Sequence, residues 1–118
     1  MAKHNDIGRI GELIAQKFLL AKGYGIRDVN YREKWGEIDI VAVYRARIVF
    51  VEVKTGRVGG PDPLEHMHTH KLDRQRRVIE TYRAKEKVGS CWQCDVLRVL
   101  LDEAGRQAFI RHYKRVVL

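Results

Sequence analysis

Hydrophobic residues recur along the chain with two different periods, and the period changes at glycine-rich or polar breaks. Apolar positions at helical spacing predict a first helix over residues 6–22, which Gly23 ends. The apolar face expected for this helix consists of Ile7, Ile10, Ile14, Phe18 and Ala21. A second helix is expected from about residue 64 or 70 to Lys87. Its expected apolar face consists of Leu72, Val78, Ile79 and Tyr82.

The remaining apolar segments are rich in β-branched and aromatic residues, which favour strands. Five strands are expected, over residues 24–31, 37–44, 47–54, 91–101 and 107–113. Residues 55–63 contain both prolines of the chain and are expected to form a loop. The resulting order, αβββαββ, predicts an α/β fold in which helices flank a mixed sheet. The length of 118 residues fits one domain, residues 1–118.

Two glycines interrupt the first predicted helix, and each costs it about 0.5–1 kcal/mol relative to alanine. Small residues at Gly8 and Gly11 would let the helix backbone approach a neighbouring element closely. Glu12 lies on the stripe formed by Gly8, Ala15 and Leu19, beside the expected apolar face. We therefore expect the carboxylate of Glu12 to be half covered when the helix packs on the sheet.

The second and third predicted strands carry charged residues on faces that are otherwise apolar, namely Asp39 on one strand and Glu52 and Lys54 on the other. If the turn between them is centred between Arg45 and Ala46, paired residues have numbers that sum to 91. Asp39 then lies directly opposite Glu52, with about 4.5–5.5 Å between their Cβ atoms.

Two carboxylates at this spacing repel each other unless a positive charge lies between them. Mg²⁺ prefers one or two carboxylates together with waters and phosphate oxygens. Lys54, on the same face as Glu52, could orient a water or stabilise charge that develops on a phosphate. This set predicts metal-assisted hydrolysis of a phosphodiester. The alternative interpretation is a solvated ion-pair patch on an exposed face of the sheet.

The charge balance indicates an anionic partner. Lys and Arg number 23 against 15 Asp and Glu, so the formal net charge is +8. No apolar run approaches the roughly 20 residues that a membrane span needs, and the first residues lack the apolar core of a secretion signal. We therefore expect a cytoplasmic protein with a nucleic-acid partner, DNA above all. The residues expected to contact the nucleic acid are Arg57, in the predicted loop, and Lys71, Arg74, Gln75 and Arg77, on the second predicted helix.

The two cysteines, Cys91 and Cys94, form a C-x-x-C motif, which is typical of zinc or redox sites. They lie on a predicted strand, where residues three apart point to opposite faces. A zinc ion would also need ligands from the histidine tract at residues 66–70. Semi-buried thiols and polar loop histidines are the preferred interpretation.

The motifs resemble those of the PD-(D/E)xK, restriction-endonuclease-like superfamily. They resemble more closely the YraN-type family of predicted endonucleases, which is distantly related to archaeal Holliday junction resolvases. The matching segments are Gly8-x-x-Gly11-Glu12-x-x-Ala15, Asn30-Tyr31-Arg32, Gly36-Glu37-Ile38-Asp39-Ile40-Val41 and Val49-Phe50-Val51-Glu52-Val53-Lys54-Thr55. The positions that fit the following helix and a later strand are Lys71, Gln75, Arg76-Arg77 and Asp95.

The resemblance implies that Asp39 and Glu52 hold Mg²⁺ or Mn²⁺ and that Lys54 positions the attacking water. It also implies that Glu12 is a supporting active-site acid and that the backbone carbonyl of Val53 completes the inner sphere of the metal. The expected function is metal-dependent hydrolysis of DNA, with branched or damaged structures among the substrates. The alternative is a non-catalytic nucleic-acid-binding module that retains the nuclease fold. A homodimer is expected by analogy with related enzymes that pair two subunits to cut two strands.

Overall fold

The computed structural model describes residues 4–65 and 69–117, without the side chains of residues 4, 5 and 69–73. Its elements, in chain order, are α1 (His4–Ala21), β1 (Gly25–Glu33), β2 (Gly36–Tyr44), β3 (Arg47–Arg57), α2 (Thr69–Glu86), β4 (Trp92–Leu101) and β5 (Ala108–Tyr113). The predicted order αβββαββ and the α/β class are confirmed. Within the described residues, neither helix is long and apolar enough to cross a membrane.

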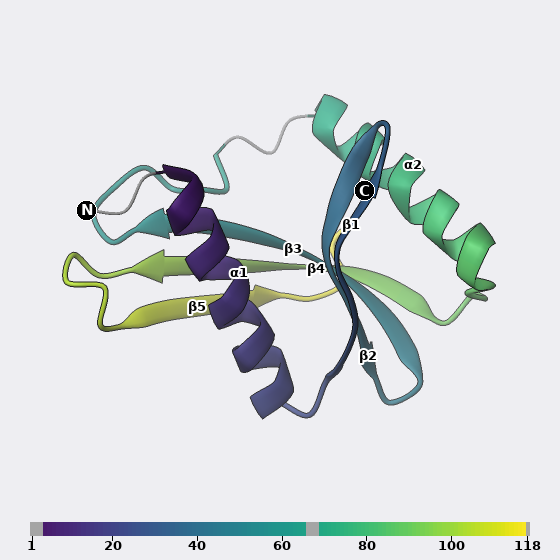
Figure 1. Ribbon diagram of the computed structural model, residues 1–118, viewed down its shortest axis with the longest axis horizontal. Coiled ribbons are helices and arrows are strands. Elements are labelled where there is room, and N and C mark those ends of the chain that lie inside the picture. The colour runs from purple at the N-terminus through teal and green to yellow at the C-terminus, as the bar shows by residue number, and fades with distance from the viewer. Residues whose placement is uncertain (1–3, 66–68, 118) are drawn as a thin grey trace.

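The strands form one five-stranded sheet in the order β1-β2-β3-β4-β5, and a helix packs on each face (Figure 1). Neighbouring strands are antiparallel except for β3 and β4, which are parallel. Parallel neighbours need a crossover connection of a dozen or more residues, and α2 lies within that connection. The sheet is therefore mixed, as the element order predicted.

The face that α1 buries agrees with the predicted one in part. Ile7, Ile14 and Phe18 pack against the core, as predicted. The fully buried residues are Ala15 and Leu19, whereas Ile10, at 41%, and Ala21 are exposed. The reason is a close approach at Gly11, where a Cβ atom would lie 1.9 Å from Oγ1 of Thr55 on β3. Gly11, Ala15 and Leu19 are spaced four residues apart, so the stripe that they form faces the sheet.

The opposite face of the sheet packs against α2. Val78, Ile79 and Tyr82 of α2 are at most 2% exposed and form a cluster with apolar residues of the sheet, including Phe50. These three residues were predicted to form the apolar face of this helix. Leu72, the fourth, lies among the residues whose side chains are not described.

A two-residue turn joins β2 to β3. Both turn residues have left-handed backbones, with φ of 49° at Arg45 and 66° at Ala46, as in the primed turns that suit hairpins. The pairs run from Tyr44↔Arg47 to Ile40↔Val51, so paired residue numbers sum to 91. The predicted register is therefore confirmed over this range.

The pairing of β2 with β3 ends one step before Asp39 and Glu52. Beyond this point the β1–β2 hairpin bends toward α2 (Figure 1). Regular alternation along β2 would place Ile38 and Ile40 on the same face of the sheet. Instead, Ile38 is buried in the apolar cluster that contacts α2, and Ile40 in the cluster that contacts α1, so the alternation is broken where the hairpin bends. The pair Asp39–Glu52 consequently lies where the two strands separate.

The third strand is longer than predicted. Residues 55–57, expected to begin a loop, continue β3 because they pair with Val99, Leu100 and Leu101 of β4. This pairing is remote in sequence, and it overrides the weak strand preference of a Thr-Gly-Arg segment.

Candidate active site

A cavity of about 550 Å³ opens between α1, the β2–β3 hairpin and α2. Its lining includes Gly8, Asp39, Glu52, Lys54, Arg74 and Gln75. The three charged residues that the strand pattern singled out therefore converge on one cavity. Asp39 and Glu52 are buried residues, with 7% and 8% exposure, so they do not form the exposed ion-pair patch of the alternative interpretation.

Asp39 lies where the strand pairing on both sides is interrupted. The pairing with β1 skips Asn30 and Asp39, and Asn30 has a left-handed backbone with φ of 51°. The pairing with β3 ends before Glu52. The backbone N–H of Val53 donates instead to Oδ2 of Asp39, at 2.8 Å. A side-chain carboxylate thus accepts a β3 backbone N–H, and this bond fixes the orientation of Asp39.

Glu52 is held by two donors from different elements. Nε2 of Gln75, a buried residue on α2, donates to Oε2 of Glu52 at 2.5 Å. Nζ of Lys54 lies 3.2 Å from Oε1 of the same carboxylate. Because each oxygen has its own donor, the carboxylate is fixed relative to both β3 and α2. Gln75, expected to approach nucleic acid, is here a residue that orients Glu52.

Burial raises the pKa of Asp39 well above its ordinary value, and the nearby charge of Glu52 raises it further. The N–H of Val53 opposes this shift, while Glu12 and a hydrogen bond with Glu52 add to it. Two buried carboxyl groups this close repel each other when both are ionised, even though the ammonium of Lys54 lies beside Glu52. A cation between them would remove the cause of the shift.

Glu12 reaches the same region from α1 and is half-buried, as predicted. Burial and the charge of Glu37 raise the pKa of the Glu12 carboxyl, and a hydrogen bond with Asn30 partly offsets them. Asn30 was part of a matching motif, but sequence reasoning gave it no role. Asparagine tolerates the left-handed conformation better than most residues, and that preference was the available indication.

The donor set fits Mg²⁺ or Mn²⁺ better than zinc. Among the described residues, no group of three or more His, Cys, Asp or Glu could hold a metal ion. Mg²⁺ is bound by as few as one or two carboxylates, which Asp39 and Glu52 supply, and it keeps several waters. Cys91 is exposed and Cys94 buried, and both are free thiols. Residues 66–68 of the histidine tract lie outside the described part of the chain.

The predicted phosphate-contacting residues do not all meet at this cavity. Arg74 is exposed and lines the cavity. The guanidinium of Arg77 lies 4.6 Å from the centre of the ring of Trp35, and Trp35 also lines the cavity. Arg57 lines a different hollow, beside α1 and the β4–β5 connection. The side chain of Lys71 is among those not described.

Comparison with known proteins identifies the family. The model of the uncharacterised protein family UPF0102 matches residues 11–99. A UPF0102 protein of Alkaliphilus oremlandii is 44% identical over 104 residues, which cover 85% of this chain and 89% of that protein. One from Clostridium botulinum is 36% identical over 115 residues, which cover 94% of this chain and 93% of that protein. The chain therefore belongs to the uncharacterised protein family UPF0102, the YraN-like family that its motifs indicated.

Proposed function

We propose that the chain is a Mg²⁺- or Mn²⁺-dependent nuclease that hydrolyses phosphodiester bonds of DNA. The observation that carries this proposal is the convergence of the Asp39 and Glu52 carboxylates and the Lys54 ammonium on one cavity. Two acids and one fixed cation suit a reaction in which negative charge develops on a phosphate.

When bound, a divalent cation polarises a phosphoryl oxygen and makes a coordinated water more acidic. Asp39 and Glu52 would hold this ion, and Gln75 keeps Glu52 in place. The ammonium of Lys54 can donate a hydrogen bond to a phosphate oxygen or to the attacking water. The raised pKa of Glu12, whose charge acts on Asp39 from α1, favours a role in holding or passing a proton near the two carboxylates.

The charge of the protein supports a nucleic-acid substrate. The net charge of +8 attracts a polyanion, and Arg74 is exposed at the cavity. Phosphate contacts from arginine position a nucleic acid without reading its sequence. We therefore propose DNA substrates chosen by structure, including branched or damaged forms.

The proposal is tested by incubating the protein with labelled four-way junctions, linear duplex DNA and RNA, in Mg²⁺ or Mn²⁺. We expect DNA cleavage, and a loss of about 100-fold or more in the Asp39→Asn and Lys54→Met variants, as is typical when a group that stabilises transition-state charge is removed. Mn²⁺ binding, followed by electron paramagnetic resonance, should weaken in Asp39→Asn. A matched control is Glu103→Gln, an exposed carboxylate in the β4–β5 connection, which should keep full activity.

Two outcomes would overturn the proposal. Cleavage that survives both substitutions would show that the reaction occurs elsewhere. Salt-sensitive DNA binding without cleavage in either cation would identify a binding module that retains the nuclease fold.

A further inference from the structure

A second cavity, of about 510 Å³, lies between α2, the start of β3, the start of β4 and the segment after β5. Three guanidinium groups from three separate segments line it: Arg47 at the start of β3, Arg76 on α2 and Arg115 after β5. We call it the arginine cavity. It shares no lining residue with the candidate active site.

The two cavities lie along the same face of the sheet. A small hollow between them is lined by Glu52 and Gln75 of the candidate active site and by Ile79 and Val116 of the arginine cavity. On β3, Arg47 and Glu52 are five residues apart, which corresponds to about 16 Å at about 3.3 Å per residue. One strand of B-form DNA rises that distance in about five nucleotides, at 3.4 Å each.

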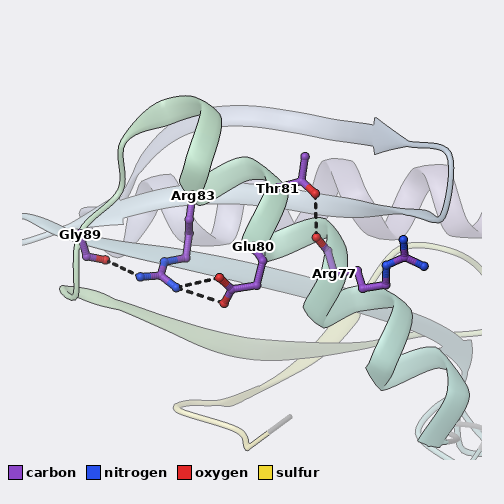
Figure 2. Close-up of polar contacts among 5 residues, drawn as sticks. All are labelled: Arg77, Glu80, Thr81, Arg83 and Gly89. Atoms are coloured by element: carbon purple, nitrogen blue, oxygen red, sulfur yellow. Dashed lines mark hydrogen bonds and ion pairs between the residues drawn. The ribbon is translucent and has the colours of Figure 1, made fainter.

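Two of the arginines that line the arginine cavity, Arg47 and Arg115, bond neutral groups. Arg47 donates to the backbone oxygen of Trp92 at 3.4 Å, and Nε of Arg115 to Oε1 of Gln93 at 3.5 Å, so both long bonds go to neutral acceptors. The lining also includes Glu80, whose two oxygens accept from Arg83 at 3.1 and 3.2 Å (Figure 2). Because Arg83 engages that carboxylate and the bonds of Arg47 and Arg115 go to neutral groups, these two arginines are suited to an anion from outside the chain.

The backbone holds Arg115 in place. Its φ of 55° is left-handed, a conformation that costs most residues about 1 kcal/mol or more. Its N–H donates to Oδ1 of the buried Asp95 at 3.0 Å, and the next N–H, of Val116, donates to the oxygen of Cys94 at 2.8 Å. These two bonds hold the backbone of Arg115 and its neighbour in place despite the unfavourable conformation.

The aromatic rings around the arginine cavity are already covered. Arg83 lies over the ring of Trp92 at 4.7 Å, and the rings of Phe50 and Trp92 form a T-shaped pair with centroids 5.7 Å apart. Beyond Arg47, Tyr44 is stacked on Tyr24 at 4.4 Å. These rings therefore offer little surface for base stacking, which single-stranded nucleic-acid sites use, whereas the arginines can contact phosphates.

We propose that the arginine cavity is a second phosphate-binding site, which holds the backbone of a nucleic acid about five nucleotides from the phosphate at the candidate active site. The inference rests on the proposed function, because it assumes that nucleic acid occupies the first cavity. It predicts recognition through phosphates alone, without preference for sequence.

The test measures the anisotropy of a labelled 12-base-pair duplex over a range of salt concentrations, without divalent metal. Each phosphate contact contributes about 0.9 to the slope of log K against log salt. We expect Arg47→Gln/Arg115→Gln to reduce this slope by about 2 and to weaken binding about 10-fold or more. Arg76→Gln, on the exposed surface of α2, should reduce it by about 1 even if the double variant folds poorly. The matched control is Arg106→Gln/Arg111→Gln, which removes two exposed charges near β5 and should leave the slope within about 0.5 of wild type.

Equal slopes for wild type and Arg47→Gln/Arg115→Gln on this duplex would overturn the inference. So would tight binding of inorganic phosphate to the arginine cavity without any effect on DNA. Because the assay contains no metal, its result is independent of cleavage, and a protein that binds as described but never cleaves would refute only the proposed nuclease activity.

Discussion

Gly8 and Gly11 lie one turn apart on α1, but the same substitution should have opposite effects at the two positions. A Cβ at Gly11 would lie 1.9, 2.7 and 2.8 Å from Oγ1, Cγ2 and Cβ of Thr55, so rotation of the threonine side chain cannot relieve the clash. We expect Gly11→Ala to lower the free energy of unfolding by about 1–3 kcal/mol, as overpacking does. At Gly8 a Cβ atom would meet nothing within 4 Å, so Gly8→Ala should raise the free energy of unfolding by about 0.5–1 kcal/mol. Guanidinium denaturation measures both, and effects of equal sign would contradict the contact between α1 and Thr55.

The sequence predicted close approach at both glycines, and the structure places it at Gly11 alone. Sequence shows which positions lack a Cβ, but the contact partner depends on how α1 rotates when it packs on β3. The convergence of Asp39 and Glu52, in contrast, could be predicted from the sequence, because it depends on a short turn and on the alternation of residues within strands, which are local properties. The contact between Asn30 and Glu12 joins β1 to α1, and no local pattern encodes it.

The β2–β3 turn is strained in a way that a single substitution should relieve. Ala46 has φ of 66°, where a residue with a Cβ is disfavoured by about 1–2 kcal/mol, and glycine is the usual residue at this position of a primed turn. Glycine also makes the unfolded chain more flexible, which offsets part of the gain. We expect Ala46→Gly to raise the free energy of unfolding by about 0.5–1 kcal/mol, measured by urea denaturation. Ala84→Gly, the same change at an exposed position of α2, should lower it by about 1 kcal/mol.

The elements themselves followed from periodicity, whereas their ends did not. The order of helices and strands depends on spacing within each segment, which the chain displays directly. The continuation of β3 to Arg57 depends on pairing with β4, which lies some forty residues later. The bend that moves Ile38 to the α2 side follows the separation of β2 from β3, which is again a contact between elements.

At the scale of the whole molecule, one buried carboxylate joins three parts of the chain at the edge of the sheet. Asp95 on β4, 1% exposed, accepts hydrogen bonds from Gln93 at 2.9 Å and from the backbone of Arg115 at 3.0 Å, and it lies 2.6 Å from Nε2 of His112 on β5. Burial by itself raises the pKa of Asp95, but the bonds from His112, Arg115 and Gln93 outweigh it, so the net pKa lies below the ordinary 3.8. The ionised carboxylate is therefore the form that holds this edge together.

A carboxyl group whose pKa is lower in the folded chain than in the unfolded chain stabilises the fold. This stabilisation is complete at pH values above the pKa of the unfolded chain, and it is lost as the pH falls through the pKa of the folded chain. Asp95→Asn should therefore lower the free energy of unfolding at pH 7 by about 1.5–3 kcal/mol, the range for hydrogen bonds to charged groups. The difference from wild type should shrink once the pH drops below about 4, where the unfolded carboxyl is protonated. Urea denaturation from pH 3 to 8 measures this, with Glu103→Gln as a control that shows no such dependence. A difference that stays constant over that range would mean that Asp95 supports the β4–β5 edge by its shape and not by its charge.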